Sequence, residues 1–196
     1  MNRGILPRRT GRSVSTWIHG VLVALALGFA GCGDDIAVVE DQSTGRFSPE
    51  EYARDAAQGP IPVAVLGSAY GVGGERLARL VLNHMQGADW APHATFAAAG
   101  ETTGSRIYSY VMMFNGPLDV TAAALCAQPD HVTPAPEATD AKTIRVVAGL
   151  CRNDEIATGV TARAANIGGI GDAKFHTLIV AVVQALTRPN QTRIDR

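Results

Sequence analysis

The side chain with the clearest potential chemistry in this sequence is Arg76, which follows a glycine-rich segment at 67–74. An apolar run at 61–66 precedes this segment and an amphipathic pattern follows it, so we expect a strand, a turn and a helix. Backbone N–H groups at such a helix start can bind a small anion. The candidate binding residues are Gly71, Gly73, Gly74 and Arg76. The favoured interpretation is that the glycines only relieve a tight turn, and anion binding is the alternative.

The same segment matches neither standard phosphate motif. A P-loop needs a lysine that the segment lacks, and Arg76 stands where a dinucleotide fingerprint needs its last glycine. A hydrolase would need an activated nucleophile, and Ser68 lacks the spacing of a nucleophile elbow. The sequence therefore predicts no catalysis, although a ligand binder or hydrolase built on this turn stays the alternative function.

Histidines and carboxylates could supply a metal site, and His84, Asp89 and His93 lie close together in the sequence. Their spacing puts no two of them on one helical face, and no cysteine or glutamate completes a known zinc pattern. His131 and His176 have no obvious partner in the sequence. We therefore expect neither a metal nor a cofactor.

The N-terminal segment ends at a cysteine after an apolar run. Arg3, Arg8, Arg9 and Arg12 precede that run at 17–31, which is followed directly by Cys32. The run is shorter than the roughly 20 apolar residues of a membrane-spanning helix. The pattern resembles the lipobox of bacterial lipoprotein precursors, which implies a signal peptide at 1–31 and acylation of Cys32. An uncleaved anchor and an ordinary signal peptide are the alternatives.

The lipoprotein resemblance also implies a location. Lipoproteins of this kind carry three acyl chains, and each buried methylene contributes about 0.8 kcal/mol to membrane binding. The residue after the acylated cysteine is Gly33 rather than an aspartate, which favours sorting to the outer membrane over retention in the inner membrane. We therefore expect a lipid-anchored protein of the cell envelope that faces the periplasm.

Two further cysteines, Cys126 and Cys151, remain once Cys32 is assigned to lipid. In an oxidising compartment, two cysteines of one small domain most often form a disulfide. The bridge would stabilise the fold by roughly 3.5 kcal/mol on the chain-entropy model. The alternative is a pair of buried, reduced thiols.

Charge excludes some classes of partner. The leader holds four of the 17 basic residues and none of the 18 acidic ones, so the remainder of the 196-residue chain carries a net charge of about −5. Its only lysines are Lys142 and Lys174. Nucleic acid binding needs clustered basic residues, which this sequence lacks. We therefore expect no nucleic acid partner.

The rest of the chain divides into a flexible acidic tether at 32–47, a single α/β domain at 48–188 and a disordered tail at 189–196. Hydrophobic periodicity and capping signals predict helices near 48–58, 74–86, 118–127 and 172–188, and strands near 61–66, 94–99, 107–114, 143–151 and 156–164. This order predicts an α/β (α+β) fold: one mixed sheet of about four to five strands, with two main amphipathic helices mainly on one face. Both faces of the segment at 107–114 are apolar, which indicates either a buried central strand or an edge that receives a partner strand.

The outline is similar to the α/β domain of curli-secretion-type envelope lipoproteins. The likeness rests on the strand at 61–66 with its glycine turn and Glu75-Arg76-Leu77-Ala78, on the hairpin at 144–164 with Thr158-Gly159, and on the final amphipathic helix. Function does not follow from this outline. The expected lipid anchor, the tether, the single α/β domain and the lack of a catalytic motif together favour a non-catalytic binding or assembly accessory with an envelope protein as its partner. A structural envelope spacer is a further alternative.

Overall fold

The computed structural model describes residues 36–89, 94–102, 104–133 and 143–187. Seven strands form one mixed sheet in the order β1-β7-β6-β5-β2-β3, and β4 pairs with β2. The strands are β1 (Ile36–Ser43), β2 (Ile61–Ala69), β3 (Val72–Gly73), β4 (Phe96–Ala98), β5 (Tyr108–Phe114), β6 (Thr143–Arg152) and β7 (Glu155–Ala165). The helices are α1 (Pro49–Ala56), α2 (Gly74–Met85), α3 (Ala122–Ala127) and α4 (Ala173–Thr187), with a 3₁₀ turn at Pro129–His131.

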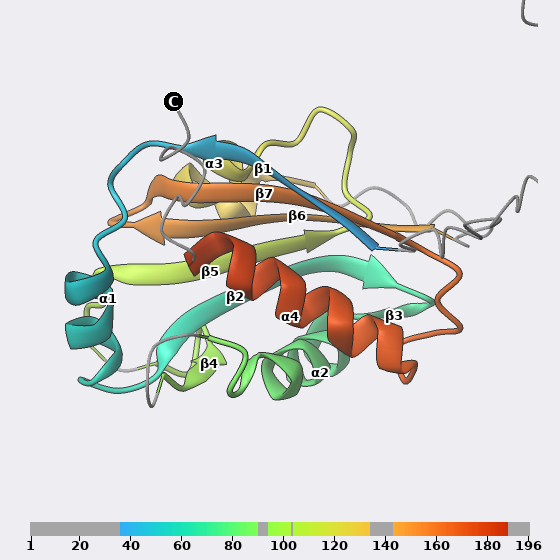
Figure 1. Ribbon diagram of the computed structural model, residues 1–196, viewed down its shortest axis with the longest axis horizontal. Helices are drawn as coiled ribbons and strands as arrows, with labels where there is room; N and C mark the ends of the chain where they lie inside the picture. Colours follow the sequence, from blue (N-terminus) through green and yellow to red (C-terminus); the bar gives the residue numbers. More distant parts are fainter. Residues whose placement is uncertain (1–35, 90–93, 103, 134–142, 188–196) are drawn as a thin grey trace, which may run out of the picture. The chain divides into compact units, whose positions relative to one another are not determined.

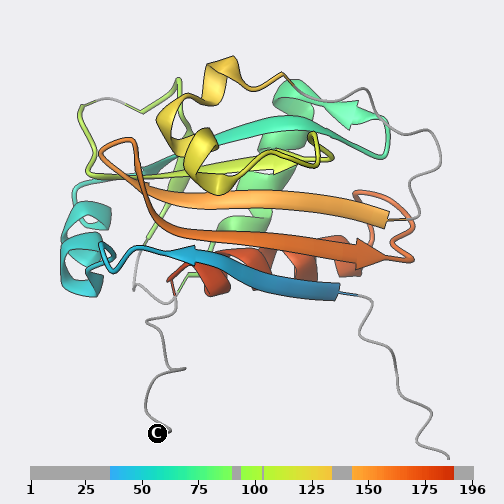
Figure 2. The same ribbon diagram turned by 90° about the horizontal axis from the view of Figure 1, so that it is seen from above.

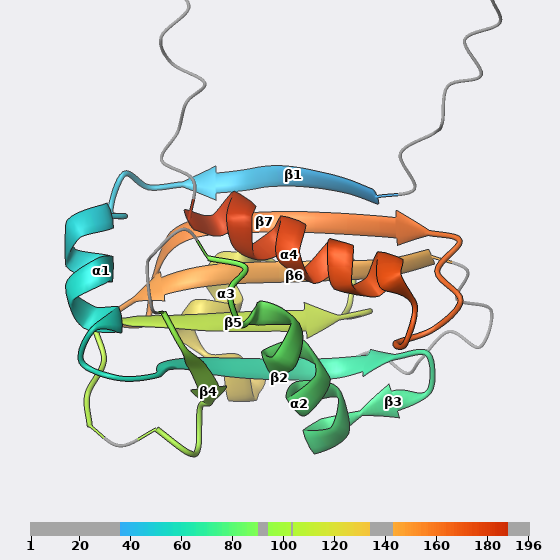
Figure 3. The same ribbon diagram turned by 60° about the horizontal axis from the view of Figure 1, so that its bottom comes forward.

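The helices cover the two faces of the sheet unequally. The long helices α2 and α4 lie side by side on one face, and α1 lies across one end of the strands (Figures 1 and 3). The short helix α3 lies on the opposite face (Figure 2). The α/β class, the mixed sheet and the two main helices on one face are as predicted, but the sheet has seven strands instead of four or five.

The larger of two apolar cores lies under α2 and α4. Helix α2 buries Leu77, Val81 and Met85, and helix α4 buries seven residues: Phe175, Leu178, Ile179, Val182, Val183, Leu186 and Thr187. The opposite face carries a smaller core under α3, which includes Leu125, Met113 and Val147. Among the described α-helices, only the short α3 covers that second face (Figure 2).

Strand β5 is the central strand of the sheet. It pairs with β6 on one side, antiparallel, and with β2 on the other, parallel. Six of its seven residues are buried. The interpretation of this segment as a buried central strand is thus confirmed, and the alternative of an edge that receives a partner strand is wrong.

The outer edge next to the N-terminus is formed by β1, in a stretch where the sequence predicts a tether. Ile36 and Val38 pack against the larger core, while Ala37 and Val39 point to the opposite face. The described residues, this strand included, belong to one compact unit. The structure therefore differs from the predicted tether at 32–47, because two alternating apolar residues are enough to hold the segment in the sheet despite Glu40 and Asp41.

Two tight hairpins connect neighbouring strands. Between β6 and β7 the turn residues Asn153 and Asp154 both have positive φ, at 50° and 64°. The β2–β3 hairpin turns at Tyr70 and Gly71, with φ of 52° and 73°. Turns with two such residues match the twist of antiparallel strands, which explains the polar and glycine residues at these positions.

Candidate functional site

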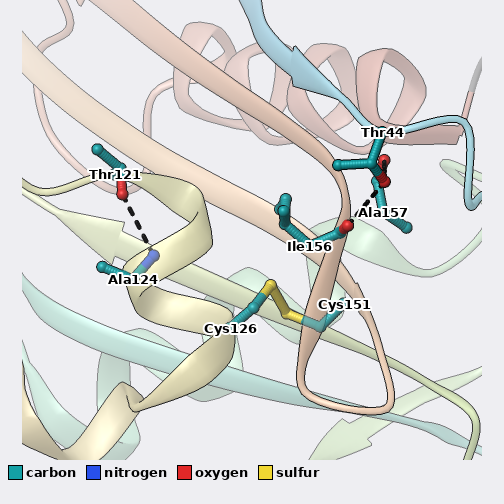
Figure 4. The surroundings of a disulfide bond; sticks show 7 residues. All are labelled: Thr44, Thr121, Ala124, Cys126, Cys151, Ile156 and Ala157. Carbon is teal, nitrogen blue, oxygen red and sulfur yellow. Dashed lines mark hydrogen bonds between the residues drawn. A yellow bond between two sulfur atoms is a disulfide. The ribbon is translucent and has the colours of Figure 1, made fainter.

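The predicted cysteine pair forms a disulfide that joins α3 to the end of β6. The Cα atoms of Cys126 and Cys151 are 5.5 Å apart (Figure 4). Both residues are buried, and Thr121 caps α3 by accepting a hydrogen bond from the backbone N–H of Ala124. A Cβ on Gly149 would lie 3.0 Å from the sulfur of Cys126, so the glycine allows the helix to approach the sheet. The third cysteine, Cys32, lies outside the described residues.

The glycine-rich segment forms the β2–β3 hairpin and the start of α2. Gly71 lies at the hairpin tip, Gly73 precedes the helix, and Gly74 and the exposed Arg76 lie in its first turn. A Cβ on Gly71 or Gly74 would meet nothing within 4 Å, but both residues have positive φ. The backbone conformation alone therefore accounts for these two glycines, and anion binding by Arg76 stays a prediction.

A hollow of about 340 Å³ lies beside α2 and is lined by side chains of both charges. Glu75 and Arg79 of the helix face it together with Glu101, and Ala78, Leu82 and Ala98 complete the wall. Two carboxylates and one guanidinium leave the lining with an excess of one negative charge, which does not favour an anion there.

The three residues considered for a metal do not meet in the described structure. The carboxylate of Asp89 accepts a hydrogen bond from the hydroxyl of Tyr52, and His84 contacts His176 of α4. His93 lies outside the described residues. Within the described part of the chain, no group of three or more histidine, cysteine, aspartate or glutamate residues could hold a metal ion.

A polar network fastens α1 to the sheet. Glu51 accepts two hydrogen bonds from Arg152, at 2.7 and 2.9 Å, and a third from the hydroxyl of Tyr108 at 3.1 Å. The contact with Arg152 lowers the pKa of Glu51 to about 2. These residues are engaged with one another, so the network is a structural joint between α1 and the β6–β7 hairpin.

An open surface suited to binding lies beside β1, on the face of the sheet that carries α3. We call it the β1 surface; it comprises Ala37, Val39, Arg145, Thr161 and Arg163 around a shallow hollow of about 390 Å³. The strand register places Ala37 opposite Arg163, and Arg163 opposite Arg145. Two arginines therefore lie side by side on neighbouring strands, an arrangement that is destabilising by itself.

The guanidinium of Arg145 is held in place by the chain itself. It donates to the backbone carbonyls of Gly116, Pro117 and Leu118, at 3.5, 2.8 and 3.3 Å. Arg163 is exposed, and among the side chains that the structure describes no carboxylate forms an ion pair with either arginine. The β1 surface thus brings two guanidinium groups together in a chain whose net charge is negative.

Apolar side chains accompany this charge. Val39 is 59% exposed and Leu118 is 82% exposed, and they are the exposed large hydrophobic residues of the described chain. Val39 belongs to the β1 surface, and the carbonyl of Leu118 bonds to Arg145. No described strand pairs with the outer side of β1. An edge strand of this kind, with an exposed apolar residue and two arginines, can bind a partner through backbone pairing, apolar contact and charge.

Sequence reasoning did not find the arginine pair because a β-bulge changes the register. At the hairpin end Arg152 pairs with Glu155, and continuing that register would put Ala162 opposite Arg145. The irregularity at Leu150/Cys151 shifts the pairing by one residue and brings Arg163 opposite Arg145. A one-residue shift moves side chains to the other face, and no local sequence signal marks this bulge clearly.

Comparisons with known proteins add little. No protein-family model matches the chain, and no curated protein matches it. Among solved structures, the chain is similar to a dodecamer of a PelC point variant from Paraburkholderia phytofirmans, with 11% identity and a TM-score of 0.46 over 79% of this chain and 99% of that chain. Likeness at this level carries no argument about function. No helix among the described residues is long and apolar enough to cross a membrane.

Proposed function

We propose that this protein is a lipoprotein anchored through acyl chains on Cys32, and that its folded unit is a non-catalytic binding or assembly accessory of the cell envelope. The basic start, the apolar run and Cys32 support the anchor. The disulfide between Cys126 and Cys151 fits an oxidising compartment. Gly33 after the acylated cysteine supports an outer-membrane position facing the periplasm.

The observation that carries the proposal is the closeness of Cys32 to the β1 surface along the chain. Three residues, and so four Cα-to-Cα steps, separate Cys32 from Ile36, the first residue of β1. At no more than about 3.6 Å per residue, the acylated cysteine lies within about 14 Å of the strand. A surface held this close to the membrane meets partners that are themselves in or on that membrane.

The chemistry of the β1 surface specifies the kind of partner. Arg145 and Arg163 fit carboxylate or phosphate groups, which arginine binds through two parallel hydrogen bonds. Val39 adds an apolar contact, and the outer side of β1 offers backbone groups for an additional strand. We therefore propose an envelope protein that presents an acidic segment to this edge.

The anchor is tested on the protein purified from membranes of the native host. Mass spectrometry should find an acylated N-terminus at Cys32 and no leader. Replacing Cys32 by Ala should move the protein to the soluble fraction without changing its thermal stability. A mature N-terminus at Met1, or a protein without added acyl mass, would contradict the anchor.

The binding surface is tested by a photo-crosslinking residue at Val39, with a second one at the exposed Arg76 as the control. Crosslinks in membranes should form at Val39 and should be lost in Arg163→Glu. The charge reversal Arg76→Glu, combined with the photo-crosslinking residue at Val39, should leave the Val39 crosslinks intact. Crosslinks that survive Arg163→Glu but disappear in Arg76→Glu would favour the glycine-rich turn instead. If neither position yields a product, the binding role is wrong and a structural spacer is the better account.

A further inference from the structure

Two histidines that are far apart in the sequence meet between the two main helices. His84 lies in the last turn of α2 and His176 in the first turn of α4. Their Nδ1 atoms are 3.2 Å apart, and the ring centroids are 5.0 Å apart. The ring of His84 also packs edge-to-face on Phe175, which is fully buried, so one of the two imidazoles is held firmly.

The distance between the two nitrogens matches that of two ligands on one metal ion. Imidazole nitrogens bind Zn²⁺ at 2.0–2.1 Å, and two of them at a tetrahedral angle lie about 3.3 Å apart. The rings are inclined by 60°, and a further tilt of the exposed His176 would aim both lone pairs at a common point. We propose that His84 and His176 bind a transition-metal ion of the Zn²⁺, Ni²⁺ or Cu²⁺ class between α2 and α4.

The protonation state of the pair suits this role. A metal needs the neutral imidazole, and burial together with the neighbouring His176 lowers the pKa of His84. No charged side chain other than His176 acts on His84 in the described structure. A hydrogen bond between the two Nδ1 atoms requires one of them to carry a proton, and which one depends on the tautomers. An ion bound by both Nδ1 atoms would need that ring in its Nε2-protonated form.

The donor set also selects among metals. Two imidazoles favour borderline ions, whereas Mg²⁺ and Ca²⁺ need oxygen ligands. With two protein ligands the remaining positions belong to water, so the ion stays open to a further ligand. Because the two histidines come together only in the folded chain, a bound ion would link α2 to α4 and stabilise the native state.

The experiment uses the folded protein without a histidine tag and titrates it with ZnCl₂, NiCl₂ and MgCl₂ by calorimetry. We expect one saturable site per chain for Zn²⁺ and Ni²⁺, and no binding of Mg²⁺. His176→Gln should weaken Zn²⁺ binding at least tenfold, and His84→Gln should do the same. The matched control is His131→Gln, which removes an exposed histidine outside the pair and should bind like the wild type.

A second measurement keeps the test decisive if His84→Gln fails to fold. The unfolding temperature of the wild type should rise with added Zn²⁺, and the rise should vanish in His176→Gln, whose exposed side chain is not needed for folding. Equal Zn²⁺ binding by His176→Gln and the wild type would overturn the proposal. So would a wild-type protein that binds Zn²⁺ no better than Mg²⁺.

Discussion

At the scale of single residues, the interior of the larger core holds a small chain of hydroxyl groups. The phenol oxygens of Tyr52 and Tyr110 lie 2.8 Å apart, and the Tyr52 hydroxyl also donates to Asp89. Burial is the main cause that raises the pKa of both tyrosines; the next cause is Tyr110 and then Asp89 for Tyr52, and Asp89 for Tyr110. Both therefore stay neutral and serve as hydrogen-bonding groups that join α1, β5 and the end of α2.

This network predicts a difference between two tyrosine substitutions. Tyr52→Phe leaves the buried Tyr110 hydroxyl without its partner, which should lower the free energy of unfolding by about 1–3 kcal/mol. Tyr70→Phe is the control because the Tyr70 hydroxyl is buried without a partner, so its loss should be neutral or slightly stabilising. Urea unfolding of the two variants measures both values. Equal values would mean that the network does not contribute to stability.

The ion pair between Glu51 and Arg152 predicts how stability depends on pH. The pKa of Glu51 falls from 4.5 to about 2 on folding. The unfolded chain therefore binds a proton more readily, and the stabilisation by this carboxylate is complete above about pH 4.5 and is lost as the pH falls towards 2. Glu51→Gln should be less stable than the wild type at pH 7, and the gap should narrow between pH 4.5 and 2. The exposed Glu50→Gln is the control, and a gap that stays constant with pH would contradict the argument.

At the scale of the elements, α3 depends on its covalent link. It has only six residues, so it cannot persist by its own helix propensity. The disulfide closes a loop with a sequence separation of 25 residues. Replacing both cysteines by serine should therefore lower the free energy of unfolding by about 3.5 kcal/mol.

The measurement compares urea unfolding of the oxidised protein, the reduced protein and the double serine variant. Reduction should lower the free energy of unfolding by about as much as the double substitution does. Amide exchange should accelerate first in α3, because the larger core does not depend on the bridge. A reduced protein as stable as the oxidised one would mean that packing alone holds α3.

The sequence predicts these elements unequally. The Ser48 cap, the apolar stripes of α2 and α4, and the Asn153–Asp154 turn are local signals, and the corresponding elements form where expected. Strand β1 is not predicted, because Glu40 and Asp41 make the segment resemble an acidic tether. Its alternating residues nevertheless pair with β7. The contact of His84 with His176 depends on the packing of two helices 92 residues apart, and no local pattern encodes it.

At the scale of the whole molecule, the order of the strands decides which surfaces stay open. Strand β5 pairs on both sides, so a partner strand could be added only at one of the outer strands. Long-range pairing of β1 with β7 puts the N-terminal strand at that edge. The α/β class follows from the alternation of helices and strands, but the strand count and this pairing do not, because they depend on contacts between distant segments.

The position of β1 changes how far the folded unit can lie from an acylated Cys32. A flexible tether from Gly33 to Phe47 would span roughly 21 Å on average as a random coil. A strand that begins at Ile36 leaves a reach of at most about 14 Å. Whether this segment pairs as β1 or stays a tether therefore decides how far the folded unit can lie from an acylated Cys32.

Two neighbouring substitutions test this arrangement. Val38 packs against the larger core and Val39 is 59% exposed on the opposite face. Val38→Asp puts a charge against that core and should lower the free energy of unfolding by roughly 2–4 kcal/mol. Val39→Asp should change it by less than about 0.5 kcal/mol, because its side chain stays in water beside two arginines.

Urea unfolding of these two variants separates three arrangements of the N-terminal segment. A large loss for Val38→Asp alone supports the strand in its present register. A large loss for Val39→Asp alone means a register slipped by one residue, because such a slip exchanges the two faces of the strand. If both substitutions are neutral, the segment is a tether and the β1 surface does not exist as described. The short distance between acyl anchor and binding surface would then be lost, and with it the reason to seek the partner in the same membrane.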